Sequence, residues 1–490
     1  MSENLNNEIF TIGIGGAAGE GVKYVGNNIG LLLRDLGFQI YLSLDYPSLI
    51  RGGHNFVRLS ASVDKIWNDH AKLDILICLN EKTAEIHKSE LKEGAWVLEG
   101  LNNEEILGKV REFLSTKGLA DFASGSVAPK GELIDGNTAF AKGLQMAGLD
   151  FYFAYPMTPS TSILHYLASK QTKEGLKVIQ PENEIAVINM ALGSVYTGKR
   201  VAVGTATGGF ALMQEAFSFS GMAELPLVLA VVQRQGPATG VPTRSSQSDL
   251  RFVIHAGHGE FPRIVLAPGD PEECFKAGIE AMDLAWKFKS PVIVLLDKAL
   301  SEHIMTVDIE RLTQLSLKAT AGEENANIIF PGTPEKVVKV TSYEHDEEGI
   351  TVDKPEDVKT AMDRRFAKGE KIKEEMNNRE TIKIYGDTSS KNTIVFFGSS
   401  KSPILEAAKL LEKNIKLVQI LWLEPFDSEK LKKEFEGMNK IICVEANHSG
   451  QLASLIRERT GIEVTDKILR YDSLPFEPEE LALQINSILK

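Results

Sequence analysis

An acidic residue at the start of a helical stretch is the strongest chemical signal in this sequence. Glu184 opens the segment 184–193, in which small and apolar residues recur at the three- and four-residue spacing of one helix face. Alanine and glycine keep the surface of the first turns thin, which leaves room for a flat ring beside the carboxylate. Farther on, the apolar run 201–203 leads into Thr207-Gly208-Gly209, which predicts a strand, a glycine-rich turn and a second helix.

A carboxylate in this position suits thiamine diphosphate. Protonation of the aminopyrimidine N1′ promotes the imino tautomer that removes the thiazolium C2 proton, so the cofactor requires an acid beside that nitrogen. We expect Glu184 to be this acid, and Thr207, Gly208 and Gly209 to let the backbone approach the same ligand at the end of a parallel strand. Each piece alone has a simpler interpretation, in which Glu184 caps a core helix and an ordinary strand-to-helix turn follows.

The diphosphate half of such a site is missing from the sequence. Thiamine enzymes usually hold the diphosphate through a metal ion, with Gly-Asp-Gly followed farther on by an asparagine. No Gly-Asp-Gly occurs here, because Gly269-Asp270 and Gly386-Asp387 both continue into other residues. The sequence therefore predicts the pyrimidine half of the site on this chain and the diphosphate half on a partner.

A proline-rich run carries a resemblance to a known family. The segment 155–161 reads Tyr-Pro-Met-Thr-Pro-Ser-Thr and resembles the Tyr-Pro-Ile-Thr-Pro-Ser signature of the 2-oxoacid:ferredoxin oxidoreductases, with Met157 in place of isoleucine. The resemblance implies that Thr158 binds the substrate carboxylate. Its hydroxyl is a donor on a turn that two prolines fix. In the alternative, this is a proline-rich loop in which Thr158 only caps a helix.

Two arginines are candidates for the second carboxylate ligand. The segment 233–244 is similar to a region of the same family in which an arginine pairs with the 2-oxoacid. Arg234 matches best, at the end of the apolar strand 227–232, and a guanidinium offers two parallel donors to a carboxylate. Arg244 is the competing candidate, which could instead reach the distal carboxylate of a dicarboxylic substrate or lie solvated on a loop.

Composition limits the class of protein. With 43% hydrophobic and 25% charged residues the chain is typical of a soluble globular protein of several domains. A net charge of −13 disfavours nucleic-acid binding, and without a basic leader or an apolar run of about 18 residues we expect a cytoplasmic protein with no membrane partner. Cys78, Cys274 and Cys443 lie too far apart for a four-cysteine cluster, so we expect buried thiols.

The expected fold class is α/β, with several domains. Short apolar segments alternate with helical patterns, as in a doubly wound parallel sheet with both faces covered. We expect a short gamma-type domain over 1–125, a thiamine diphosphate pyrimidine-binding domain over 132–305, a charged connector over 306–385 with one amphipathic helix at 354–376, and a transketolase C-terminal-like domain over 386–490. Thr158, Gly208-Gly209 and Arg234 all follow predicted strands and should therefore lie at one edge of the central sheet.

Four features of the sequence have no settled role. The strand 9–14 and the glycine loop 15–21 resemble the gamma-type domain, whereas the loop alone is a weak dinucleotide signal. Arg51 and His54 stand in a glycine-rich turn, either at a subunit contact, near a phosphate, or in local hydrogen bonds. Asn447 and His448 either line a subunit interface or cap the helix that begins near Gly450. A metal site at Glu344-His345-Asp346-Glu347 is disfavoured, since one histidine in an acidic loop is seldom specific.

The resemblance covers nearly the whole chain and implies a reaction. It implies oxidative decarboxylation of a 2-oxoacid with coenzyme A to acyl-CoA and CO2, with electrons passing to ferredoxin. A beta subunit would supply Mg²⁺ and a [4Fe–4S] cluster, in a heterodimer or a dimer of heterodimers. The fused gamma–alpha layout and the run 342–347 favour 2-oxoglutarate. Pyruvate, branched-chain 2-oxoacids, a non-catalytic scaffold and an NAD- or FAD-binding oxidoreductase are the alternatives.

Overall fold

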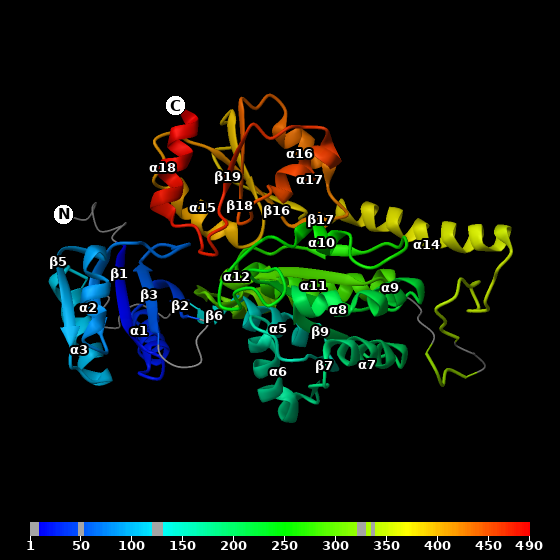
Figure 1. The fold of residues 1–490 in the computed structure, drawn as a ribbon, viewed down its shortest axis with the longest axis horizontal. Helices are drawn as coiled ribbons and strands as arrows, with labels where there is room; N and C mark the ends of the chain where they lie inside the picture. The colour runs from blue at the N-terminus through cyan, green and yellow to red at the C-terminus, as the bar shows by residue number, and fades with distance from the viewer. Residues whose placement is uncertain (1–8, 48–52, 120–130, 321–329, 335–338) are drawn as a thin grey trace.

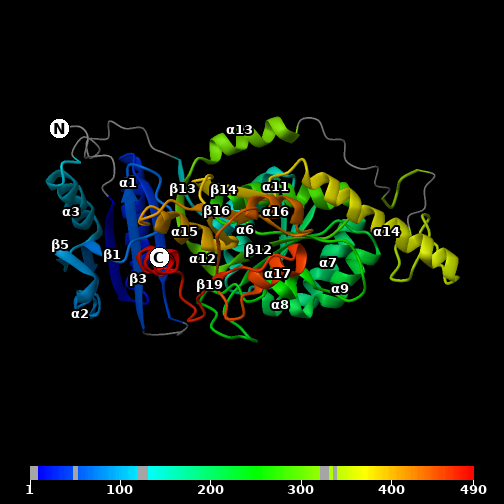
Figure 2. The same ribbon diagram turned by 90° about the horizontal axis from the view of Figure 1, so that it is seen from above.

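Three β-sheets with covering helices make up the computed structural model (Figure 1). It describes residues 9–47, 53–119, 131–320, 330–334 and 339–490. The N-terminal sheet lies at one end of the molecule and α14 extends at the other, in both views (Figures 1 and 2). Among the described residues, no helix combines the length and apolar character needed to cross a membrane.

The central sheet has the predicted doubly wound parallel form. Its strand order is β17-β11-β12-β10-β9-β7-β8, and all pairs are parallel except that of the edge strand β17 with β11. The strands are β7 (Phe151–Phe153), β8 (Lys177–Ile179), β9 (Val201–Ala206), β10 (Val228–Gln233), β11 (Ile264–Leu266), β12 (Val292–Asp297) and β17 (Trp422–Glu424). The helices of this region are α5 (Gly136–Met146), α6 (Thr161–Glu174), α7 (Glu184–Tyr196), α8 (Thr207–Leu212), α9 (Gln214–Met222), α10 (Leu250–Ile254), α11 (Pro271–Phe288) and α12 (Lys298–Glu302).

Alternation along the strands explains why both faces of this sheet are covered. Leu229 and Val231 of β10 pack in the cluster that includes α7, α8 and α9, whereas Val228 and Ala230 pack with α5 and α11 on the other face. Successive side chains of a strand point to opposite faces, so an uninterrupted apolar run is buried on both sides.

The N-terminal sheet is completed by strands from elsewhere in the chain. Its order is β5-β4-β1-β3-β2-β13-β6, and β13 pairs antiparallel with both β2 and β6. The strands are β1 (Phe10–Ala17), β2 (Gln39–Asp45), β3 (His54–Ser62), β4 (Leu73–Cys78), β5 (Leu91–Glu99), β6 (Glu132–Asp135) and β13 (Ile304–Val307). The helical elements are α1 (Val22–Asp35), α2 (Lys82–Ile86), the 3-10 helix η1 (Lys88–Glu90) and α3 (Asn103–Thr116).

The first strand is longer than the sequence predicts. We expected it to end at Ile14, but β1 continues to Ala17 because Gly15 and Gly16 pair with residues of β3. A side chain at Gly15 would lie 2.5 Å from Thr83 Cγ2, so this glycine serves close packing inside a strand. The turn before α1 is therefore shorter than predicted.

A third sheet forms the C-terminal part, in the order β14-β16-β15-β18-β19. Its strands are β14 (Ile382–Gly386), β15 (Asn392–Phe396), β16 (Lys416–Ile420), β18 (Lys440–Glu445) and β19 (Asp466–Leu469), and its helices are the 3-10 helix η2 (Gly398–Ser400), α15 (Lys401–Ala408), α16 (Ser428–Phe435), α17 (Gln451–Thr460) and α18 (Pro478–Leu489). Between the central and C-terminal sheets the chain forms α13 (Ile309–Thr320) and α14 (Pro355–Met376). The helix predicted over 354–376 is thus confirmed.

A buried ion cluster joins the C-terminal part to the central part. The Nζ atom of Lys401 lies 2.5 Å from Asp270 Oδ2 and 2.5 Å from Glu273 Oε1, and the lysine side chain is 1% exposed. Burial alone would raise the pKa of Asp270, but Lys401 outweighs it and lowers that pKa to about 2. Gln419 Nε2 also donates to Glu273 Oε2 at 2.6 Å, so the carboxylates are satisfied from α15 and β16.

We predict that Lys401→Met costs about 3–5 kcal/mol of unfolding free energy, because it leaves two buried carboxylates without their cation. Urea unfolding followed by circular dichroism measures the loss. Lys432→Met is the matched control, since Lys432 forms an exposed pair with Glu429 at 2.9 Å and should cost less than about 0.5 kcal/mol. Equal losses in the two variants would contradict this account of the junction.

Candidate active site

Four of the predicted site residues lie at one edge of the central sheet. Thr158, Glu184, Thr207 and Arg234 follow β7, β8, β9 and β10, which are neighbours in the sheet and run parallel. Parallel strands present their carboxyl ends at the same edge, which is where α/β sheets bind ligands. The predicted gathering of these segments is confirmed.

Glu184 begins α7 as a buried carboxylate. Asn183 caps the helix by accepting from the amide of Ala186 at 2.9 Å, which leaves the Glu184 side chain directed away from a capping role. Glu184 is only 4% exposed, and no hydrogen bond or ion pair from the described residues reaches its carboxylate. The carboxylate oxygens are not among the buried polar atoms that lack a partner, so they remain accessible to a ligand at this sheet edge.

The glycine pair after β9 lies in a helix and not in the turn we predicted. The helix α8 begins at Thr207, directly after the extended cap residue Ala206, so both glycines occupy its first turn. A Cβ atom on Gly209 would lie 2.2 Å from Thr205 Oγ1 and 2.8 Å from Glu184 Cγ. Gly209 is therefore the residue that lets α8 approach the Glu184 side chain.

Thr207 has a partner that the sequence did not reveal. Its hydroxyl donates to Asp249 Oδ2 at 2.8 Å, and the Asp249 amide donates to Gln233 Oε1 at 3.0 Å. Burial raises the pKa of Asp249, although the bond from Thr207 acts in the opposite direction. Asp249 is far from Thr207 in sequence and belongs to no periodic pattern, so only the fold identifies it.

Thr158 and Arg234 are brought together. The Nη1 atom of Arg234 donates to the backbone carbonyl of Thr158 at 2.6 Å, which ties the end of β10 to the loop after β7. Burial lowers the pKa of Arg234. Guanidinium has five N–H donors, so one bond to the loop leaves others for a carboxylate.

Arg244 points away from Arg234 although their backbones are close. The amide of Gln235 donates to the Arg244 carbonyl at 3.2 Å, which closes the loop between the two arginines. The side chain of Arg244 instead reaches Asp45 at the end of β2, with Nη1 2.7 Å from Oδ1. It lines a cavity of about 340 Å³ that also includes His54 and Glu477.

A larger cavity opens between the N-terminal sheet and the Thr158 loop. Its volume is about 540 Å³, and Gly19, Tyr46, Thr158 and Glu302 are among its lining residues. The hydroxyl of Tyr46 donates to Glu302 at 3.0 Å, across the junction of the two sheets. We did not select Glu302 from the sequence, although its helix α12 follows β12 at the same sheet edge.

The polar clusters without a settled role have local partners. His54 Nε2 lies 2.8 Å from His87 Nε2, whose ring Nδ1 lies 2.7 Å from Glu90; Arg51 is outside the described residues. Asn447 accepts from the amide of Gly450 at 2.8 Å, as in a helix cap.

The structure also shows the contacts of the acidic loop 344–347 and the burial of the three cysteines. Glu344 pairs with Arg365, and within the described ranges no three His, Cys, Asp or Glu side chains group as metal ligands. The predicted burial of Cys78, Cys274 and Cys443 is confirmed.

Two family models match separate segments of the chain. One is described as pyruvate flavodoxin/ferredoxin oxidoreductase, thiamine diphosphate-binding, and matches residues 142–365. The other, pyruvate ferredoxin/flavodoxin oxidoreductase, matches residues 11–123. A single chain therefore carries both modules.

Relatives and a solved structure agree with these matches. The 2-oxoacid:ferredoxin oxidoreductase subunit alpha of Sulfolobus sp is 29% identical over 609 aligned positions, covering 97% of this chain and 96% of the relative. Since 609 positions exceed the 490 residues here, that relative has segments that this chain lacks. The 2-oxoglutarate synthase subunit KorA of Archaeoglobus fulgidus is 31% identical, covering 66% of this chain and 89% of the relative.

The solved structure is a 2-oxoglutarate:ferredoxin oxidoreductase from Magnetococcus marinus with 2-oxoglutarate, coenzyme A and succinyl-CoA bound. It superposes with a TM-score of 0.86 at 25% identity, covering 99% of this chain and 100% of that chain. The match spans all three sheets. Together with the sheet edge that carries Thr158, Glu184 and Arg234, these findings show that the chain belongs to the alpha subunits of the 2-oxoacid:ferredoxin oxidoreductases, with a fused gamma domain.

Proposed function

We propose that this chain, with a beta subunit, carries out thiamine-dependent oxidative decarboxylation of 2-oxoglutarate with coenzyme A to succinyl-CoA and CO2, with electrons passing to ferredoxin. The observation that carries the proposal is the carboxylate of Glu184, a residue only 4% exposed and without a partner among the described residues, at the same sheet edge as Thr158 and Arg234. The bound ligands named for the Magnetococcus marinus enzyme favour this substrate over pyruvate and branched-chain 2-oxoacids.

The residues present fit the pyrimidine half of thiamine diphosphate. Glu184 lacks a donor within the described part of the chain, and Gly209 removes the side chain that would otherwise meet it. When bound, the cofactor supplies a thiazolium ring that accepts the electrons left as CO2 departs. Glu184 holds a proton at the ring nitrogen N1′.

Thr158 and Arg234 position the substrate carboxylate. The bond between Arg234 and the Thr158 carbonyl holds the guanidinium against the backbone of the Thr158 loop, and we propose that both side chains serve one carboxylate. A carboxylate held by two fixed donors has lost most of its rotational freedom before reaction, which lowers the barrier to its departure. Arg244, across the loop, is the proposed ligand for the distal carboxylate of 2-oxoglutarate, which it would take over from Asp45.

Coenzyme A is proposed to enter the 540 Å³ cavity between the two sheets. Gly19, Gly21 and Lys23 line this cavity on the side of the N-terminal sheet, and Thr158 lines it on the other side. The amides at the start of α1 and the lysine favour phosphate groups, while the far wall leads to the substrate carboxylate.

A beta subunit is proposed to cover the sheet edge beside Glu184. Large apolar side chains are exposed there and would be buried by a partner. They are Tyr155 at 38%, Ile185 at 53%, Met190 at 44%, Leu212 at 55% and Phe252 at 37%. The partner would supply the diphosphate site, Mg²⁺ and the [4Fe–4S] cluster, in a heterodimer or a dimer of heterodimers.

Glu184→Gln tests the function directly. In the complex with the beta subunit we expect assembly by size exclusion to be unchanged and turnover of 2-oxoglutarate to fall by about 10²–10⁴-fold, because the amide cannot hold the proton. Glu215→Gln, at an exposed position on α9, is the control and should retain full activity. Wild-type turnover in the Glu184 variant would exclude the proposed role.

The two glycines of α8 test the geometry around Glu184. Gly209→Ala should displace the Glu184 side chain and lower stability by about 1–3 kcal/mol, with loss of thiamine diphosphate affinity. Gly208→Ala should be tolerated or slightly stabilising, since its Cβ would meet only the Ala238 carbonyl at 3.8 Å. Thermal unfolding and calorimetric cofactor binding compare the pair. If both variants bind the cofactor equally well, close packing at Gly209 is not required.

A panel of 2-oxoacids separates the two arginines. Arg234→Ala should lower kcat/KM for every 2-oxoacid by about 10- to 100-fold, because all of them have the carboxylate next to the keto group. Arg244→Ala should lower kcat/KM for 2-oxoglutarate much more than for pyruvate. If Arg244→Ala lowers kcat/KM for pyruvate more than Arg234→Ala does, the roles of the two arginines are reversed.

A further inference from the structure

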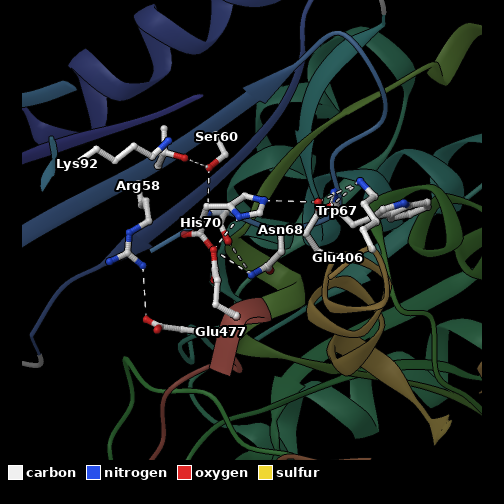
Figure 3. Close-up of polar contacts among 12 residues, drawn as sticks. Arg58, Ser60, Trp67, Asn68, His70, Lys92, Glu406 and Glu477 are labelled. Carbon is white, nitrogen blue, oxygen red and sulfur yellow. Dashed lines mark hydrogen bonds and ion pairs between the residues drawn. The ribbon is translucent and has the colours of Figure 1, made fainter. Parts of the chain in front are cut away.

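His70 lies near Glu406 of the C-terminal part of the chain, as Figure 3 shows, and it also contacts Glu479 of the same part. It follows β3 in the N-terminal sheet, and its Nδ1 atom is 2.8 Å from Glu479 Oε1 on α18. Its Nε2 atom is 3.5 Å from Glu406 Oε1 on α15, an ion-pair distance. We call these three residues the His70 junction. The ring therefore connects two parts of the molecule that are far apart in sequence.

Neighbouring contacts make the same connection. The amide of Trp67 donates to Glu406 Oε2 at 2.8 Å, and Lys409 Nζ donates to the carbonyl of Lys65 at 3.1 Å. The side chain of Glu406 is 1% exposed, so its charge depends on the groups that surround it. A buried carboxylate that loses one cationic partner is strongly penalised.

The charges around the imidazole favour its protonated form. Acids outnumber bases among the groups that face the junction, and Arg58 pairs with Glu90 as well as Glu477. The facing groups are Asp69 on the same loop, Arg58 on β3, Glu406 on α15, Lys409 directly after that helix, and Glu477 and Glu479 at the start of α18. Burial lowers the pKa of His70, but the two glutamates of the junction outweigh burial and raise it to about 9.

The opposite border of the N-terminal sheet is held in a different way. There β2 pairs with β13 through two residue pairs, Leu42 with Ile304 and Tyr41 with Met305. The 340 Å³ cavity that Arg244 lines lies between these two attachments, and Asp69 and Glu477 form part of its wall. The three residues of the His70 junction do not line this cavity themselves, but Asp69 and Glu477 lie within two residues of them, and the other walls come from the N-terminal sheet, the central part and the C-terminal segment 470–476.

We propose that protonated His70 is a positioning residue, which fixes the N-terminal sheet against α15 and α18 and so sets the width of the cavities between that sheet and the active site. Because its pKa in the folded chain is higher than the ordinary 6.5, the contribution is complete below pH 6.5 and disappears as the pH rises through about 9. The kinetic consequence rests on the proposed function, whereas the structural one does not.

Hydrogen exchange on the complex with the beta subunit tests the structural step. In His70→Gln we expect about tenfold faster hydrogen exchange over residues 65–71 and 478–489 at pH 7. The full difference between the folded and the ordinary pKa of His70 would allow roughly 300-fold. The expected effect is smaller because Glu479 is partly exposed. After correction for intrinsic rates, wild-type protection should fall to that of the variant above pH 9. His165→Gln, on the exposed side of α6, is the control. Unchanged exchange in His70→Gln overturns the proposal.

A second variant and a kinetic readout separate positioning from simple loss of stability. Glu479→Gln keeps the imidazole but removes one of its carboxylate partners, so the pH at which protection from exchange is lost should fall. A purely structural role would leave that pH unchanged. In steady-state assays, His70→Gln should raise KM for coenzyme A severalfold with kcat within about twofold of wild type. The ratio of the KM of the variant to that of the wild type should approach one above pH 9. Titration of the coenzyme A thiol affects both KM values equally and therefore cancels in this ratio. A constant ratio across that range overturns the link to the cavity, while failure of the complex to use coenzyme A overturns the proposed function alone.

Discussion

Backbone pairing between strands from different parts of the chain is the constraint on which the rest of the structure depends. Buried N–H and C=O groups must be paired, and a sheet that ended at β2 would leave an unpaired edge. The strand β13, which follows β12 and α12 of the central part, supplies those partners and pairs in turn with β6. The antiparallel strand β17 extends the central sheet in the same way. The cavity beside α12 is therefore a consequence of how the sheets are completed.

Acidic side chains have different surroundings at the junction with the C-terminal part and at the active-site edge. Asp270 and Glu273 are buried together with Lys401 and further donors, so their charges stabilise a junction. Glu184 is equally buried but has no such partner among the described residues, and Gly209 keeps the space next to it clear. An acid without a partner inside the protein is free to interact with a ligand, which agrees with the role proposed for Glu184.

Much of the central sheet could be predicted, because the apolar runs that form its strands are local features of the sequence. The strands at 151–153 and 264–266 begin and end where the apolar runs do, and the helix at Glu184 starts as predicted. The connection from Arg234 to the Thr158 carbonyl spans 76 positions, and that from Arg244 to Asp45 spans 199. Periodicity contains no information on such contacts, which depend on sheet order and loop path. The same reason explains why the pairing of β13 with β2 was not foreseen.

The loop between Arg234 and Arg244 links the two regions that these contacts define. The bond from Gln235 to the Arg244 carbonyl and the bridge between Gln235 and Val241 make it a closed unit. One end is attached to the Thr158 loop at the active-site edge, and the other to Asp45 on the N-terminal sheet. The two arginines and the backbone between them therefore connect the N-terminal sheet to the Thr158 loop by contacts that lie outside the strands of the central sheet.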